Sequence, residues 1–355
     1  MHLFDCIWSQ KQVPDSWHLA RVSAIFKKGD QSLCSNFRPI SLLSAGYKLF
    51  ALVLLNRLRA CNVDKYLWPS QFGFKRNARV TDALFMARRH IDHAYAKRDG
   101  KLCLLALDWA KAFDSIMPHS MIHALKRFGI PDDFLHMVNA IYSSRSFFVR
   151  DTNIDSTTKS QCAGISQGCP LSPVLFVMVM SVLISDARQD LVDQIGDDAR
   201  LVSEILYADD TLIVDEHGDL AGIYMQCILK QGEHYGLSFN WDKISMICIG
   251  CNPIIAKPCG SNIECSHSMM YLGGVLSADG HCTSEINRRI GLASSEFSSL
   301  QKVWSHANLS VRKKIAIYQA LIVPKLMYAL EGIWLNQCQR KRLNSFHVGC
   351  IRRII

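Results

Sequence analysis

The spacing of apolar and polar side chains along the chain predicts a mixture of helices and strands. Residues 41–60 and 81–96 carry apolar side chains at helical spacing with charged side chains between them, so both segments are expected to be amphipathic helices. The strand expected over residues 102–107, Leu-Cys-Leu-Leu-Ala-Leu, is too uniformly apolar to have a wet face. It is therefore expected in the centre of its sheet.

A buried helix and a hairpin are expected further along the chain. Ser172 and Pro173 are typical of a helix start, with Ser as the N-cap and Pro at the first helical position, where its missing N–H costs nothing. The residues that follow are apolar almost all round, which indicates a buried helix. Strands around residues 202–214 are expected to form a hairpin, and residues 219–235 a further helix. Together these elements predict a sheet with helices on one face.

The C-terminal part of the pattern is helical. After residue 274 the strand signals give way to helices that are expected to start near Thr283 and Ser310. Pro324 is expected to kink or end the second of these helices. Clusters of Lys and Arg recur in this region, so it predicts a basic helical appendage.

Acidic residues stand at the ends of two apolar runs. Asp108 follows the run 102–107, and Tyr207-Ala208-Asp209-Asp210 lies between the two strands of the expected hairpin. Adjacent carboxylates raise each other's pKa unless a cation neutralises them. Strand-end carboxylates that meet in space would hold Mg²⁺ through oxygen ligands and leave its other positions for phosphate and water. Taken alone, the Asp pair also fits a solvated turn.

Further blocks in the same order make the chain resemble reverse transcriptases, most closely those of non-LTR (LINE-type) retrotransposons. The resemblance covers nearly the whole chain. The blocks that carry it, besides the two acidic ones, are Trp17–Ala20, Phe26–Asp30, Asn36–Leu43, Gln71–Asn77, Gly164–Pro173, Gly236–Lys243, Tyr271–Gly274 and, towards the C-terminus, Leu309-Ser310, Ile317-Tyr318, Glu331–Trp334 and Leu343–His347.

The resemblance implies an α+β fold, the right-hand polymerase. Its fingers are expected over residues 1–100, its palm, with an antiparallel sheet and an interleaved fingers segment, over 101–284, and a helical thumb over 285–355, for which truncation stays open. Leu272 and Gly273 match the primer grip. The implied activity is that of an RNA-directed DNA polymerase, which takes an RNA template, a DNA primer and dNTP and uses two Mg²⁺ ions, with Mn²⁺ as an alternative.

The resemblance also implies roles for the acidic residues. Asp108 and Asp209 match the family's catalytic aspartates and are expected to be metal ligands. The backbone carbonyl of Trp109 is expected to add a metal contact. Asp210 is expected to act with them or to orient the turn. Lys243 matches a lysine that protonates the leaving pyrophosphate, with an ordinary exposed lysine as the alternative.

Further residues match the nucleotide pocket of the family. Phe113 matches the aromatic residue beside the sugar 2′ position, which favours dNTP; an ordinary core Phe is the alternative. Gln167 is expected to hydrogen-bond the incoming sugar, or else to cap a loop, and Gly168 to let the backbone approach closely. Three basic residues are expected at the triphosphate or the templating strand, with a solvated surface position as the alternative for each: Arg38, Lys75 and Arg76.

The charge distribution is consistent with a nucleic-acid partner. The net charge of +9 divides into +11 over residues 1–127, −11 over 128–284 and +9 over 285–355. Basic flanks around an acidic middle suit a protein that grips polyanions around a carboxylate site. The alternative is a basic surface that only keeps the protein soluble.

Other observations bear on the class and location of the protein. The N-terminus has no secretory signal, and the longest apolar run, residues 174–184, is too short to cross a bilayer, so we expect a soluble intracellular protein without a membrane partner. The length leaves no room for the endonuclease and zinc segments of autonomous elements, so a partial element is expected. Two alternatives stay open, namely an inactive nucleic-acid-binding relic and a protein like a group II intron maturase.

Overall fold

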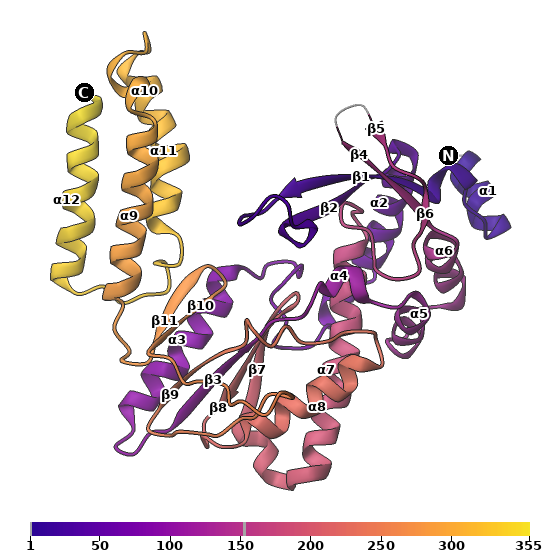
Figure 1. Ribbon diagram of the computed structural model, residues 1–355, viewed down its shortest axis with the longest axis horizontal. Coiled ribbons are helices and arrows are strands. Elements are labelled where there is room, and N and C mark those ends of the chain that lie inside the picture. Colours follow the sequence, from indigo (N-terminus) through magenta and orange to yellow (C-terminus); the bar gives the residue numbers. More distant parts are fainter. Residues whose placement is uncertain (1, 152–153) are drawn as a thin grey trace. The chain divides into compact units, whose positions relative to one another are not determined.

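The structure is a computed structural model that describes residues 2–151 and 154–355 (Figure 1). The chain forms two compact units, each assembled from three separate stretches. Unit 1 comprises Met1–Ala78, Leu107–Thr211 and Gly222–Ile244, and unit 2 comprises Arg79–Ala106, Leu212–Ala221 and Ser245–Ile355.

Unit 1 is rich in helices. Its helices are α1 (His2–Gln10), α2 (Ala45–Ala60), α4 (Ala112–Ser115), α5 (Pro118–Arg127), α6 (Asp132–Tyr142), α7 (Ser172–Ile195) and α8 (Ala221–Glu233), which enters the unit at its second residue. Short 3-10 turns lie at Asp15–Trp17, Cys34–Asn36, Val63–Lys65 and Gly196–Leu201. The helix expected over residues 41–60 is confirmed as α2, whose N-cap Ser44 accepts a hydrogen bond from the Tyr47 N–H.

One sheet lies wholly in unit 1. Its strands are β1 (Leu19–Phe26), β2 (Phe37–Leu42), β4 (Ser146–Asp151), β5 (Ile154–Asp155) and β6 (Lys159–Ser160). The order is β2-β1-β4-β5, with β6 also paired to β4. Strand β1 runs antiparallel to β2, with Ala24 opposite Pro39, and parallel to β4.

A second sheet carries the apolar strand that the sequence predicts. Its order is β7-β8-β3-β9, with β7 at Val202–Tyr207, β8 at Asp210–Asp215, β3 at Leu102–Leu107 and β9 at Ser245–Ile249. Strand β3 has a neighbour on each side, and all its residues except Ala106 are buried. Its predicted central position is therefore confirmed, as are the hairpin of β7 and β8 and the helix that follows, α8.

Helix α7 is buried along most of its length, as its apolar pattern predicts. Its predicted start is wrong by one residue, because the N-cap is Leu171 and Ser172 is already helical. The Ser172 hydroxyl is buried and lies 2.8 Å from the Tyr142 hydroxyl, so it is paired with a side chain and does not cap the backbone. Within the described residues, no helix is both long and apolar enough to cross a membrane.

The C-terminal stretch of unit 2 is a hairpin followed by helices. The hairpin strands are β10 (Ser268–Tyr271) and β11 (Gly274–Ser277), and the helices are α9 (Thr283–Ser299), α10 (Gln301–Ser305), α11 (Val311–Met327) and α12 (Gln337–Ile354). Figure 1 shows α9, α11 and α12 side by side, and their shared core includes Ile286, Phe297, Trp304, Tyr318 and Ile322. Unit 2 also holds α3 (Val80–Ala96), which confirms the helix expected over residues 81–96.

Pro324 does not end α11, contrary to one of the two outcomes expected from the sequence. The helix continues to Met327, and the Tyr328 N–H donates to the Pro324 carbonyl at 3.0 Å. Proline lacks only its own N–H, so the hydrogen bonds of the residues after it can still form. The two predicted helix starts are confirmed at α9 and α11.

Candidate active site

The acidic turn joins β7 to β8 through Ala208 and Asp209. Ala208 has a φ of 57°, a left-handed conformation that a residue with a Cβ rarely adopts. A buried side chain from a distant part of unit 1 holds it there. The Gln71 Oε1 accepts hydrogen bonds from the Ala208 N–H at 2.9 Å and from the Gly73 N–H at 2.8 Å. Gln71 therefore fixes the backbone immediately before Asp209.

The segment around Gln71 runs alongside β7. The Leu206 N–H donates to the Ser70 carbonyl at 2.9 Å, and the Phe72 N–H donates to the Leu206 carbonyl at 2.8 Å. A Cβ on Gly73 would lie 2.2 Å from the Ala208 nitrogen, so only glycine fits. The sequence alone assigned no role to Gln71, although its place two residues before this glycine in a motif block was the available signal.

Asp108 follows β3 directly and is half-buried. Residues 238–243 approach it: the Asn240 N–H donates to the Asp108 carbonyl at 2.7 Å, and the Ala110 N–H donates to the Ser238 carbonyl at 2.8 Å. The same approach brings the Lys243 Nζ within 3.1 Å of the Asp108 Oδ2. Two sequence-predicted site residues that are far apart in the chain are thus in direct contact.

Trp109, the residue after Asp108, packs into the core next to this strand end. Its indole is buried, donates from Nε1 to the Thr211 hydroxyl at 3.3 Å, and packs against Phe239 with ring centroids 4.5 Å apart. A Cβ on Gly232 would lie 2.7 Å from the same ring, so α8 packs closely on it. The side chain of Trp109 is a core element, and only its backbone is free for the metal contact predicted from the sequence.

Asp108 acts electrostatically on both aspartates of the turn. Desolvation raises the pKa of Asp209, repulsion from Asp108 adds to the increase, and Arg38 and Lys243 oppose it. The pKa of Asp210 is raised to about 6, first by desolvation and then by Asp209 and Asp108, although its side chain still reaches solvent. Carboxylates whose negative charge is disfavoured by their surroundings favour a nearby cation.

This donor set fits a hard divalent cation. Carboxylate and carbonyl oxygens are the ligands that Mg²⁺ and Mn²⁺ take, and Mg²⁺ typically uses one or two carboxylates together with phosphate and water. In the described part of the chain, no three or more His, Cys, Asp or Glu side chains are already arranged around one point as a metal centre. The fit therefore rests on the chemistry of the donors and on their shared repulsion.

Phe113 lies on α4 and is only partly buried. Its ring stacks on the fully buried Phe176 of α7, with centroids 4.3 Å apart and an interplanar angle of 12°, and meets Phe74 edge-on at 6.3 Å. Two aromatic neighbours restrict its rotation, because the ring cannot turn without losing the stack. Phe113 is thus fixed in position while part of its surface stays open.

Gln167 and Gly168 are held by contacts within unit 1. The Gln167 Nε2 donates to the Asp114 Oδ1 at 2.9 Å, and the Gln167 carbonyl accepts from the Ser41 N–H at 2.8 Å. Burial raises the pKa of Asp114, while Gln167 lowers it. Gly168 has a φ of 117°, and a Cβ there would lie 2.6 Å from the Ser41 carbonyl oxygen. Glycine is thus required here because the Gly168 backbone passes close to β2.

The three basic residues differ in their surroundings. Arg38 is exposed on β2 and lies near enough to Asp209 to lower its pKa. Arg76 is exposed, and its Nε lies 3.9 Å from the Asp64 Oδ2, so its charge is partly balanced there. Lys75, which precedes Arg76 in the sequence, is half-buried. The structure thus associates Arg38, more directly than Arg76, with the aspartates.

Comparison with known proteins defines the class. The family described as reverse transcriptase (RNA-dependent DNA polymerase) matches residues 25–276, and the chain belongs to this family. The apo telomerase of Candida tropicalis shares the fold, with a TM-score of 0.51 and 12% identity over 99% of this chain and 66% of the telomerase chain. The predicted right-hand polymerase fold is confirmed.

The individual relatives are proteins of mobile elements. The chain is 26% identical to the retrovirus-related Pol polyprotein of the type-1 retrotransposable element R2 of Popillia japonica, over 90% of this chain and 45% of the relative. It is 25% identical to the RNA-directed DNA polymerase of the mobile element jockey of Drosophila melanogaster, over 93% of this chain and 36% of the relative. A protein of transposon TX1 of Xenopus laevis is 26% identical, over 95% of this chain and 26% of the relative.

These matches confirm the resemblance to reverse transcriptases of non-LTR retrotransposons. The chain spans between about a quarter and a half of the length of these curated relatives.

Proposed function

We propose that this chain is an RNA-directed DNA polymerase of a non-LTR retrotransposon, which extends a DNA primer on an RNA template with dNTP. The observation that carries the proposal is that Asp108, at the end of β3, lies near enough to Asp209 and Asp210 to raise the pKa of both, in a chain of the reverse transcriptase family. Fingers over residues 1–100, a palm over 101–284 and a thumb over 285–355 are part of the proposal.

In this proposal Asp108 and Asp209 hold two Mg²⁺ ions, or Mn²⁺ in their place, with help from the Trp109 carbonyl. When bound, the ions would stabilise charge on the attacking and leaving oxygens of nucleotidyl transfer. Asp210 shares the negative charge and orients the turn. Burial and the two neighbouring aspartates raise the pKa of Asp210 to about 6, so a bound cation would favour its charged form.

Lys243 is proposed as the proton donor to the leaving pyrophosphate. Its side chain is 65% exposed and its ammonium group already lies beside Asp108, so it can meet an entering phosphate without a large rearrangement. In the absence of nucleotide it partly neutralises the carboxylate. In this proposal Lys243 thus pairs with Asp108 before the reaction and with a phosphate group during it.

Phe113, Gln167 and Gly168 are proposed to shape the sugar pocket. The stack on Phe176 makes Phe113 rigid, and a rigid ring beside the 2′ position would exclude a ribose hydroxyl. Gln167 is oriented by Asp114, which leaves its side-chain oxygen for a sugar hydroxyl. Arg38, Lys75 and Arg76 are proposed to meet the triphosphate or the template, with Arg38 best placed by its effect on Asp209.

Primer extension on an RNA template tests the proposal. Asp108→Asn and Asp209→Asn should each abolish extension and leave primer-template affinity within a few-fold, since one lost carboxylate removes a metal ligand and no phosphate contact. Asp198→Asn, at an exposed position of the same unit, is the matched control and should retain full activity. Binding without extension by the unmodified chain would instead support the inactive relic, and an attached maturase segment or a neighbouring intron would support the maturase-like alternative.

A further inference from the structure

The turn between β10 and β11 has an unfavourable backbone conformation. Tyr271 pairs with Gly274, so Leu272 and Gly273 form a two-residue connection, with φ values of 46° and 71°. Hairpin turns with two positive φ values strongly favour Asn or Gly at the first position, because other residues strain the backbone there. The leucine is partly exposed at the tip of the hairpin. A strained apolar residue at such a place indicates a function for its side chain.

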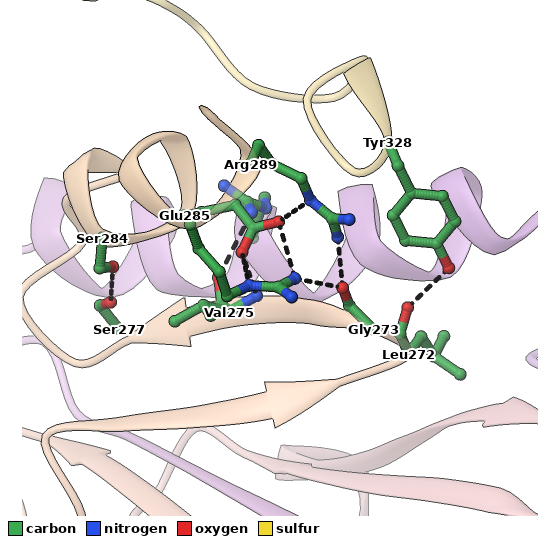
Figure 2. A network of polar contacts seen from close by, with 10 residues as sticks. Leu272, Gly273, Val275, Ser277, Ser284, Glu285, Arg289 and Tyr328 are labelled. Carbon is green, nitrogen blue, oxygen red and sulfur yellow. Dashed lines mark hydrogen bonds and ion pairs between the residues drawn. The ribbon is translucent and has the colours of Figure 1, made fainter. Parts of the chain in front are cut away.

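Side chains of α9 and of Tyr328, which follows α11, hold both carbonyl groups of this turn (Figure 2). The Tyr328 hydroxyl donates to the Leu272 carbonyl at 2.8 Å. The Gly273 carbonyl accepts from the Nη2 atoms of Arg288, at 2.5 Å, and of Arg289. The Arg289 guanidinium also lies over the Tyr328 ring, 4.5 Å from its centroid. Contacts of this kind can compensate the strain of the turn.

A buried carboxylate organises these donors. Glu285 is completely buried at the start of α9, and its Oε1 accepts from the Arg289 Nε at 2.5 Å. Its Oε2 accepts from the Arg288 Nε at 3.1 Å and from the Val275 N–H, on β11, at 3.0 Å. Glu285 thus links both arginines to β11, the strand that follows the turn. A buried carboxylate with this many donors is strongly constrained, because no donor can leave without exposing a charge to an apolar interior.

We propose that Glu285, Arg289 and Tyr328 are positioning residues that hold the Leu272-Gly273 turn in register for the primer 3′-end. This inference rests on the proposed function and on the match of Leu272 and Gly273 to the family's primer grip. Because Glu285 and Arg289 lie on α9 and Tyr328 follows α11, the same contacts fix the turn to the two thumb helices. A shift of these helices along a bound duplex therefore changes the place where Leu272 meets the terminal nucleotide.

Tyr328→Phe is the most selective test, because it keeps the ring over Arg289 and removes only the hydroxyl that bonds to Leu272. We expect kcat for dNTP addition to fall roughly two- to tenfold, the effect of one lost hydrogen bond of ordinary strength. The Kd for a DNA primer on an RNA template should stay within about twofold, since no phosphate contact is removed.

Tyr318→Phe, within the helix that precedes Tyr328, is the matched control. It removes a hydroxyl that lies 2.9 Å from the His347 Nδ1, within the buried core of the thumb helices and with no contact to the turn. This control should lower Tm at least as much as Tyr328→Phe and leave kcat unchanged. An equal fall of kcat in both variants would overturn the proposal in favour of general loosening of the helices.

Leu272→Asn distinguishes a role of the Leu272 side chain in primer positioning from a role in the stability of the fold. Asn tolerates positive φ, so the variant should have a higher Tm than the unmodified chain, yet extend primers more slowly because the apolar side chain is gone. A purely structural role for the turn predicts a higher Tm with unchanged kcat, and that result would overturn the inference.

A second readout keeps this inference distinct from the proposed function. A primer with 2-aminopurine at its 3′-end, annealed to RNA, reports the surroundings of the terminal base by fluorescence without any turnover. If the unmodified chain extends no primer, the polymerase proposal fails and the fluorescence decides alone. Different signals with the unmodified chain and Tyr328→Phe would support the positioning role, and equal signals would overturn it.

Discussion

Gly73→Ala should inactivate the site through the backbone of the acidic turn. The added Cβ would lie 2.2 Å from the Ala208 nitrogen and 2.8 Å from the Tyr207 carbonyl carbon, both of which are main-chain atoms. An ordinary contact begins near 3.4 Å, so the turn that carries Asp209 must move by about 1 Å. The turn cannot yield freely, because the Ala208 N–H is bonded to the buried Gln71.

The magnitude follows from that displacement. A misplacement of about 1 Å can cost roughly 100-fold in rate, and overpacking of this kind costs about 1–3 kcal/mol of folding free energy. We expect primer extension to fall at least about 100-fold. The free energy of unfolding should decrease by the smaller amount that overpacking gives, so most molecules stay folded.

Steady-state primer extension and urea unfolding measure the two effects. Gly349→Ala, on α12, is the control, because no atom lies within 4 Å of the new Cβ and helix interiors favour alanine. It should be as stable as the unmodified chain or more so, with the same extension rate. A folded Gly73→Ala protein that extends primers within threefold of the unmodified rate would refute the reasoning.

The remaining predictions concern metal, sugar and duplex binding. Because the folded pKa of Asp210, about 6, exceeds its unfolded value, its contribution to stability is present below about pH 4 and is lost as pH rises through 6. Mg²⁺ should therefore raise Tm more at pH 7.5 than at pH 5, as thermal melts will show; equal shifts would contradict the coupled site. Phe113→Val should raise ribonucleotide incorporation relative to dNTP, and an unchanged ratio in competition assays would leave Phe113 as a core residue. Replacing the exposed pair Arg312 and Lys313 by Gln should lower the slope of log affinity against log salt by about 2, as a salt titration of duplex binding measures. An unchanged slope would leave both charges at the solvent surface, away from the duplex.

Local pattern was enough to predict the elements that bear the site. The uniform apolar run of β3 predicts a central strand, and the same run predicts where Asp108 stands, because a strand that is buried on both faces can bring a carboxylate to the surface only at its end. The hairpin of β7 and β8 follows in the same way from two apolar runs around a turn. These predictions needed only residues that are adjacent in sequence.

The contacts that fix the site could not be predicted in that way. Gln71 reaches Ala208 across 137 positions, and Lys243 reaches Asp108 across 135. Both contacts depend on which segments pair, and pairing of distant segments leaves no periodic signal in either one. The N-cap assignment at Ser172 failed for a related reason, since the distant Tyr142 takes the hydroxyl that local pattern assigns to the helix end.

Two turns with proposed roles share one physical arrangement. Ala208 and Leu272 both have positive φ without being glycine, and in each turn a buried polar side chain from elsewhere in the same unit supplies or anchors the hydrogen bonds that hold the backbone. Local propensity opposes both conformations, and contacts from outside each turn can compensate the strain, through Gln71 in one unit and through the donors that Glu285 holds in the other. Stability is therefore sacrificed at the two places where a carboxylate and a primer end are proposed to be aligned. A substitution that makes either turn locally easier should stabilise the fold and slow the reaction, and that opposition is the signature expected of strain kept for function.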